Sequence, residues 1–187
     1  PILIKGLHRL EYRGYDSAGI ALISDNQELN VYKTKGKVAD LERFAESKDI
    51  SGCIGIAHTR WATHGEPNDV NAHPHYSQSK NLALIHNGII ENYTELKEKL
   101  LKHGYTFYSQ TDTEVVVKLV DYYYKKYNLG PIDAIAKTMV RVRGSYALEL
   151  MFRDYPGEIW VARKDSPMII GIADGETYVA SDVPAIL

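Results

Sequence analysis

The spacing of apolar residues predicts both helices and strands in the first third of the chain. Leu3, Leu7 and Leu10 fall at intervals of four and three residues, which is typical of one face of a helix. Residues 11–19 contain two glycines among polar residues and predict a loop. The elements predicted for this part are helices over residues 1–10 and 38–45, the second with Val38, Leu41 and Phe44 on one face, and strands over residues 20–24, 29–34 and 53–59.

The remaining pattern predicts a block of helices followed by a run of strands. Residues 62–81 are rich in Gly, Pro, His, Asn and Ser and predict a long loop, which an ordered domain seldom carries without a use for it. The predicted elements are a strand over 82–86, helices starting near 93, 111 and 131, and strands over 146–152, 158–162, 168–172 and 177–180. Strands arranged around a block of helices indicate an α+β fold with largely antiparallel sheets.

Composition agrees with one compact domain, because 44% of the 187 residues are hydrophobic. The formal net charge is -2 and no segment concentrates basic residues, which argues against nucleic acid or an anionic membrane as a partner. No apolar run approaches the roughly 20 residues that cross a bilayer, and no signal peptide is evident, so we expect a cytoplasmic protein. Both ends lie in apolar sequence, which suggests an excised domain.

The single cysteine offers no obvious nucleophile. One cysteine excludes an internal disulfide and fits a reducing compartment. Cys53 lies between Gly52 and Ile54 in sequence typical of a strand interior, so we expect an inert thiol in the core.

Histidines are concentrated in the middle of the chain, where a metal site has to be considered. Their spacing matches no zinc pattern, and no acidic residue or cysteine falls at a ligand interval. We therefore favour ordinary loop histidines bonded to backbone, and expect neither a metal nor a cofactor. The five histidines in question are His58, His64, His73, His75 and His86.

Two charged residues have alternative interpretations. Arg60, beside Trp61 at a strand end, could bind a carboxylate through two parallel hydrogen bonds, or could be a surface arginine that shields the indole. Asp112 heads a predicted helix, where capping is a more ordinary role than ligand binding.

Asn87-Gly88 follows an apolar strand and is the strongest short signal for a hairpin. The residues after it fall at helical spacing, however, so the chain is predicted to pass from strand to helix. A side-chain amide next to an unhindered backbone N–H could form an oxyanion hole.

Five segments carry a specific resemblance: residues 10–19 (LEYRGYDSAG), 58–67 (HTRWATHGEP), 71–75 (NAHPH), 86–92 (HNGIIEN) and 111–114 (TDTE). Their order and spacing resemble the glutaminase domain of the class II glutamine amidotransferases over essentially the whole chain. The amino-acid sequences of the first two segments resemble those of the family branch that makes glucosamine 6-phosphate, and differ from those of the purine and asparagine branches.

The resemblance implies an amino-terminal-nucleophile (Ntn) hydrolase fold, a four-layer αββα sandwich with antiparallel sheets. It also implies residue roles in binding and hydrolysing L-glutamine. Arg60 would bind the α-carboxylate of glutamine and Asp112 its α-ammonium. The pocket would also be lined by the backbone of Trp61 and by Thr63 and His64. Asn87 and Gly88 would form the oxyanion hole.

The resemblance further implies that ammonia released from glutamine passes to a sugar isomerase domain of the same enzyme, which converts fructose 6-phosphate to glucosamine 6-phosphate, in a homodimer. The family begins with Cys-Gly-Ile on a strand, and that cysteine supplies both the nucleophilic thiol and the α-amine that takes its proton. This sequence starts at the helix that follows, and Cys53 cannot substitute. We therefore expect residues 1–187 to be a glutaminase domain truncated at its amino terminus, without the first strand and the isomerase domains, and inactive as it stands.

Two alternatives remain open. The chain could be a naturally nucleophile-free, glutamine-binding regulatory module, although the presence of the pocket residues favours an enzyme. It could also be a glutaminase that serves another acceptor, against which the wording of residues 12–16 argues.

Overall fold

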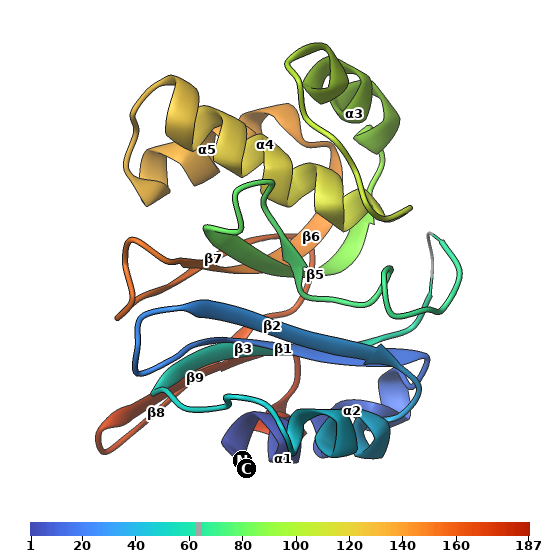
Figure 1. Cartoon of the computed structure of the whole chain (residues 1–187), viewed down its shortest axis with the longest axis vertical. Coiled ribbons are helices and arrows are strands. Elements are labelled where there is room, and N and C mark those ends of the chain that lie inside the picture. The colour runs from blue at the N-terminus through green and yellow to red at the C-terminus, as the bar shows by residue number, and fades with distance from the viewer. Residues whose placement is uncertain (63–64) are drawn as a thin grey trace.

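Two antiparallel sheets lie face to face between helical layers in the computed structural model, which describes residues 1–62 and 65–187 (Figure 1). The helices are α1 (Ile2–Leu10), α2 (Val38–Ala45), α3 (Tyr93–Lys102), α4 (Asp112–Lys126) and α5 (Pro131–Arg141), with short 3₁₀ turns η1 (Glu11–Arg13) and η2 (Val183–Ala185). The strands are β1 (Ser17–Ile23), β2 (Leu29–Lys35), β3 (Ile54–Arg60), β4 (His75–Tyr76), β5 (Leu82–Ile90), β6 (Gly144–Phe152), β7 (Ile159–Lys164), β8 (Ile169–Ala173) and β9 (Glu176–Ala180).

The first sheet has the order β2-β1-β3, and α1 and α2 cover its outer face. The predicted hairpin is confirmed, since Ile23 pairs with Leu29 across the turn. The central strand β1 is buried on both faces. Side chains alternate along it, so that Ile20 and Leu22 pack against the helices and Ala21 and Ile23 pack against the second sheet.

The second sheet has the order β4-β5-β6-β7, and α3, α4 and α5 cover its outer face (Figure 1). Its largest apolar cluster joins Leu84 and Leu150 of the sheet to Val116 and Leu119 of α4. This arrangement confirms the predicted α+β class with antiparallel sheets. Strands β8 and β9 form a separate hairpin, and the two ends of the chain meet where α1 contacts η2. No helix of the described residues combines the length and apolar character that a bilayer crossing needs.

Four sequence predictions are wrong in detail. Cys53 is exposed and precedes β3, so it is no core residue. On α2, Phe44 is exposed, and the buried face consists of Val38, Leu41 and Ala45. Strand β5 does not end at His86 but runs to Ile90 with Gly88 inside it, and β1 begins within the predicted loop, at Ser17. In the last two cases tertiary pairing extends a strand through residues that have low intrinsic strand preference.

Polar contacts to β2 and to the residues before α4 hold residues 66–72 of the long polar segment after β3. Lys33 donates from Nζ to the carbonyl oxygens of Val70 (3.2 Å) and Ala72 (2.8 Å). Asn71 bridges this segment to the residues before α4, since its Oδ1 accepts from Gln110 N at 2.9 Å. Its Nδ2 donates to the carbonyl oxygen of Glu66 at 2.9 Å. These contacts fix residues 66–72 against β2 and against the residues before α4.

Glu149 of β6 is an ionisable residue in the apolar layer between the sheets, where it pairs with Ile85. No ion pair reaches it within residues 1–62 and 65–187, and burial raises the pKa of its carboxyl group to about 8. The folded state then binds a proton that the unfolded state releases above its ordinary pKa of 4.5.

We therefore expect Glu149 to make the free energy of unfolding fall as the pH rises between about 4.5 and about 8, the interval between its two pKa values. Glu149→Gln keeps the neutral shape, so the variant should lose this part of the pH dependence. Urea denaturation at about pH 5 and about pH 8 measures it. An unchanged difference between the two pH values in the variant would show that Glu149 is not the titrating group.

Candidate active site

Strand alternation places two polar side chains at the end of the layer between the sheets. Along β3, Ile56 faces the second sheet and packs with Ile85 and Met151. His58 and Arg60 follow at intervals of two and therefore point to the same side. Both are buried, with 8% and 4% of their surfaces exposed. The apolar layer thus ends in an imidazole and a guanidinium, and a cleft opens beyond them.

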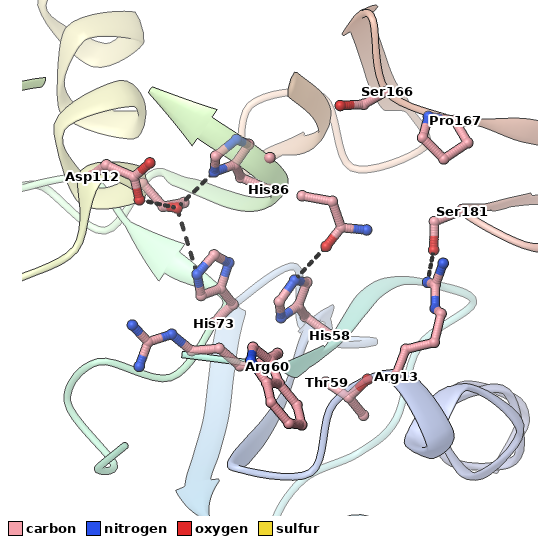
Figure 2. Close-up of a pocket in the computed structure, with 14 residues that line it drawn as sticks. Arg13, His58, Thr59, Arg60, His73, His86, Asp112, Ser166, Pro167 and Ser181 are labelled. Carbon is pink, nitrogen blue, oxygen red and sulfur yellow. Dashed lines mark hydrogen bonds between the residues drawn. The ribbon is translucent and has the colours of Figure 1, made fainter. Parts of the chain in front are cut away.

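A cleft of about 350 Å³ lies at this end of the sandwich (Figure 2). Five of the seven predicted pocket residues line it: Arg60, Trp61, Asn87, Gly88 and Asp112. They come from β3, β5 and the start of α4, which are separated in the sequence and meet only in the fold. The other two predicted pocket residues, Thr63 and His64, lie outside the described residues.

Arg60 is a buried cation whose charge faces an anion. Its guanidinium donates to the carbonyl oxygens of Gly65 and Glu66, each at 3.4 Å. Burial lowers the pKa of Arg60, while the charge of Asp112 acts in the opposite direction. Figure 2 shows both residues at the same end of the cleft. Of the two interpretations of Arg60, the surface arginine is therefore wrong, because the side chain is buried.

Asp112 is not the helix cap. Thr111 is the N-cap of α4, and its hydroxyl accepts from Glu114 N at 3.3 Å. Asp112 is the first helical residue and its Oδ2 accepts from Ile90 N at 2.9 Å. The carboxylate is therefore fixed against β5, with its negative charge beside the helix N-terminus. A buried carboxylate opposite a buried guanidinium provides an anion and a cation for one zwitterionic ligand.

The backbone N–H of Gly88 points away from β6. The ladder joins Glu91 N to Arg143 O and Arg153 N to Asn81 O, so the odd-numbered residues of β5 bond to β6. Strand β4 pairs only with Ala83 and Leu84, and leaves the edge beyond them uncovered. On that edge Ile90 N binds Asp112, and Gly88 N lies two residues earlier.

Only glycine fits at this position. Gly88 has φ of 123°, and a Cβ there would lie 2.2 Å from the carbonyl oxygen of Ser145. The neighbouring Asn87 carries its amide into the cleft, and its Oδ1 lies 2.8 Å from His58 Nε2. A side-chain amide and an unhindered N–H therefore lie next to each other at the cleft, as an oxyanion hole requires.

Four histidines predicted to be loop residues bonded to backbone are buried and each bonds to a side chain, while His58 and His75 bond to backbone as well. His58 bonds to Asn87, His73 and His86 to Thr113, and His75 to Tyr108 and Thr111. Burial lowers the pKa of His58 to about 4 and the pKa values of His73 and His75 well below the ordinary range. His58, His73 and His75 are therefore neutral near pH 7. Among the described residues no cluster has the make-up of a metal site.

Several residues that line the cleft carried no role in the sequence analysis. Arg13 lies within the motif of residues 10–19, and its guanidinium donates to Ser181 Oγ. Ser166 and Pro167, in the turn between β7 and β8, complete this end of the cleft with Ser181 (Figure 2). Nothing local marks these last three residues, because they reach the cleft only through the path of the carboxyl-terminal segment.

Trp61 lines the mouth of the cleft. Its side chain is 58% exposed and meets Tyr15 edge to face, with ring centroids 5.4 Å apart. The next residue is fixed by its backbone, since Ala62 N donates to Asp16 Oδ2 at 2.8 Å. The backbone around Trp61 is thus held in place while the indole ring faces solvent.

Comparisons with known proteins show the family to which the chain belongs. Residues 58–187 match the family model of the glutamine amidotransferase domain. The chain belongs to this family. Glutamine–fructose-6-phosphate aminotransferase (isomerizing) from Bacteroides thetaiotaomicron is 61% identical over 187 residues, and the enzyme of that name from Pyrobaculum aerophilum is 50% identical over 186. The match covers the whole of this chain and about 30% of each relative.

Solved structures of amidotransferases have a similar fold. The glutamine phosphoribosylpyrophosphate amidotransferase from B. subtilis, complexed with ADP and GMP, has a TM-score of 0.83 and 32% identity. The comparison covers 99% of this chain and 40% of that one. A glutamine aminotransferase class-II domain protein from Silicibacter pomeroyi shares the fold alone, with a TM-score of 0.58 and 16% identity over 88% of this chain and 79% of that one. The expected Ntn hydrolase fold is thereby confirmed.

Proposed function

We propose that this glutamine amidotransferase domain binds L-glutamine in the cleft and supports its hydrolysis to glutamate and ammonia. The observation that carries the proposal is the convergence of Arg60, Asp112 and Asn87-Gly88 on one cleft from three separate elements. A zwitterionic amino acid needs a cation and an anion at one end, and its amide needs hydrogen-bond donors at the other. The cleft has both sets.

Arg60 holds the α-carboxylate of glutamine and Asp112 its α-ammonium. Both side chains are buried, so each charge interacts with its partner more strongly than in water. The family resemblance assigns Thr63, His64 and the backbone of Trp61 to the binding of the same end of the ligand. Asn87 Nδ2 and Gly88 N donate to the carbonyl oxygen of the side-chain amide as it becomes a tetrahedral oxyanion.

The nucleophile is the amino-terminal cysteine that the resemblance implies, with its own α-amine as the base. A thiolate attacks the amide carbon, the oxyanion is stabilised, and ammonia leaves to give a thioester that water hydrolyses to glutamate. Cys53 has no part in this, because it is exposed in the segment before β3 and does not line the cleft.

The acceptor of the ammonia is a hexose phosphate. The support is the name shared by the curated relatives, which is that of an aminotransferase acting on fructose 6-phosphate, with identities of 50–61% in the two described above. We therefore propose glucosamine 6-phosphate as the product of the full-length protein. A sugar isomerase domain in the part of the relatives that this chain does not match would make it, in a cytoplasmic homodimer.

Ammonia release from L-glutamine by the full-length protein, with and without fructose 6-phosphate, tests both levels of the proposal. We expect glutamate and ammonia in equal amounts, and glucosamine 6-phosphate when the sugar is present. Release of ammonia without formation of amino sugar would support the glutaminase proposal and contradict the proposed hexose phosphate acceptor. Glutamine binding without hydrolysis would instead indicate a regulatory module.

A further inference from the structure

Asn87 can serve an oxyanion only if its amide is turned the right way. The two faces of the amide are chemically opposite, since Oδ1 accepts hydrogen bonds and Nδ2 donates them. An amide with its oxygen toward the cleft would repel a developing negative charge. Some group must therefore hold the oxygen away from the substrate, and that group has to be a donor.

The structure places His58 where such a donor is needed. Its Nε2 lies 2.8 Å from Asn87 Oδ1, and the ring also has a hydrogen bond with the backbone of His86. A neutral imidazole carries one N–H. With an oxygen as the neighbour of Nε2, the proton belongs on Nε2 and His58 donates to Asn87. Both N–H groups of the Asn87 amide are then left for the cleft.

Burial keeps His58 in this neutral form. The ring is 8% exposed, and desolvation lowers its pKa to about 4 despite the hydrogen bond to Asn87. The neighbouring cation Arg60 acts in the same direction. At neutral pH His58 therefore has a single N–H group, and with the proton on Nε2 the ring is the donor and Asn87 Oδ1 the acceptor.

The ring is also prevented from turning. His58 stacks on His73 with centroids 4.2 Å apart and planes inclined by 14° (Figure 2). His73 is held in turn by the hydroxyl of Thr113, 3.4 Å from its Nε2, and the same hydroxyl lies 3.0 Å from His86 Nδ1. Thr113 belongs to the first turn of α4, directly after Asp112.

We infer that His58 is a positioning residue of the glutaminase site, which donates to Asn87 Oδ1 and thereby turns the Asn87 amide N–H groups toward the substrate oxyanion. The inference rests on the proposed function of this cleft. His58 itself touches neither the nucleophile nor the scissile bond. It acts across the interface between the two sheets, from β3 on one to β5 on the other.

Two variants of similar polarity separate this role from general packing. Glutamine at position 58 can place an amide N–H close to where Nε2 lies, whereas the shorter asparagine cannot. In the full-length protein, His58→Gln should keep most of the kcat for glutamine hydrolysis, and His58→Asn should lose ~10–100-fold, the range typical for removing a group that orients a functional residue. The KM for glutamine should change little in both. Equal kcat values in the two variants would overturn the inference.

A double-mutant cycle then tests the route through Asn87. If His58 acts only by orienting that amide, His58→Asn should have almost no further effect on kcat once Asn87→Ala is present. An equal loss in both backgrounds would refute the positioning role while leaving the glutaminase proposal intact. If Asn87→Ala by itself leaves kcat unchanged, the oxyanion assignment fails first. His103→Gln, on the exposed end of α3, is the matched histidine control and should retain wild-type kcat.

Discussion

Asn87→Ala should lower the kcat of glutamine hydrolysis in the full-length protein by roughly 10²–10³-fold, the usual effect of removing one oxyanion donor. The carbonyl oxygen of the glutamine amide carries a full negative charge only in the tetrahedral state. The donor therefore contributes more there than in the ground state, and the KM for glutamine should stay within a few-fold of wild type. Steady-state measurement of glutamate formation gives both constants.

Asn26→Ala is the control for this variant, because Asn26 lies exposed in the turn between β1 and β2. It should leave both constants unchanged. The oxyanion assignment is wrong if Asn87→Ala retains wild-type kcat. A raised KM with unchanged kcat would instead mean that Asn87 binds the ground state of the amide.

Arg60→Ala should chiefly weaken the binding of glutamine. Loss of a hydrogen bond to a charged group costs about 1.5–3 kcal/mol, which corresponds to a KM raised roughly 10–100-fold. The contact with the α-carboxylate is the same before and during the chemical step, so kcat should fall much less. Titration calorimetry with glutamine, next to steady-state kinetics, measures the two effects separately.

Arg60→Lys is the informative companion, since lysine keeps the charge but lacks the planar fork that binds two carboxylate oxygens. It should recover part of the affinity. Arg60 also donates to Gly65 and Glu66, so the melting temperature of each variant has to be checked for a loosened loop. Wild-type affinity in a well-folded Arg60→Ala protein would remove Arg60 from the binding site.

Much of the fold could be read from the sequence, because its elements depend on local patterns. The stripe at Leu3, Leu7 and Leu10 gave α1, and the proline at position 131 marked the start of α5. The alternation of apolar runs with turn residues gave the hairpin of β1 and β2. The predicted boundaries were wrong where pairing with another strand sets the end of an element. Gly88 is an example, because its place inside β5 depends on pairing with β6.

The site itself was only partly predictable. Arg60, Asp112, Asn87 and Gly88 stood out because their residue types suit the binding of an amino acid and of an oxyanion, and the resemblance of the surrounding motifs gave them roles. The sequence left open whether Arg60 was buried and whether Asp112 was a cap. Those questions depend on the distance between β3 and α4, which no local pattern contains.

The sequence by itself determined the chemistry that the cleft can offer: a cation, an anion, an amide, an unhindered N–H and a set of histidines. The tertiary structure decided which of these groups meet and how they are oriented. Packing of one sheet on the other puts His58 against Asn87 and removes water from the His58 ring, which makes it a neutral hydrogen-bonding group and not a charged one. Burial and contact between distant strands are properties of the folded chain, and they set the protonation state and the orientation of the groups in the site.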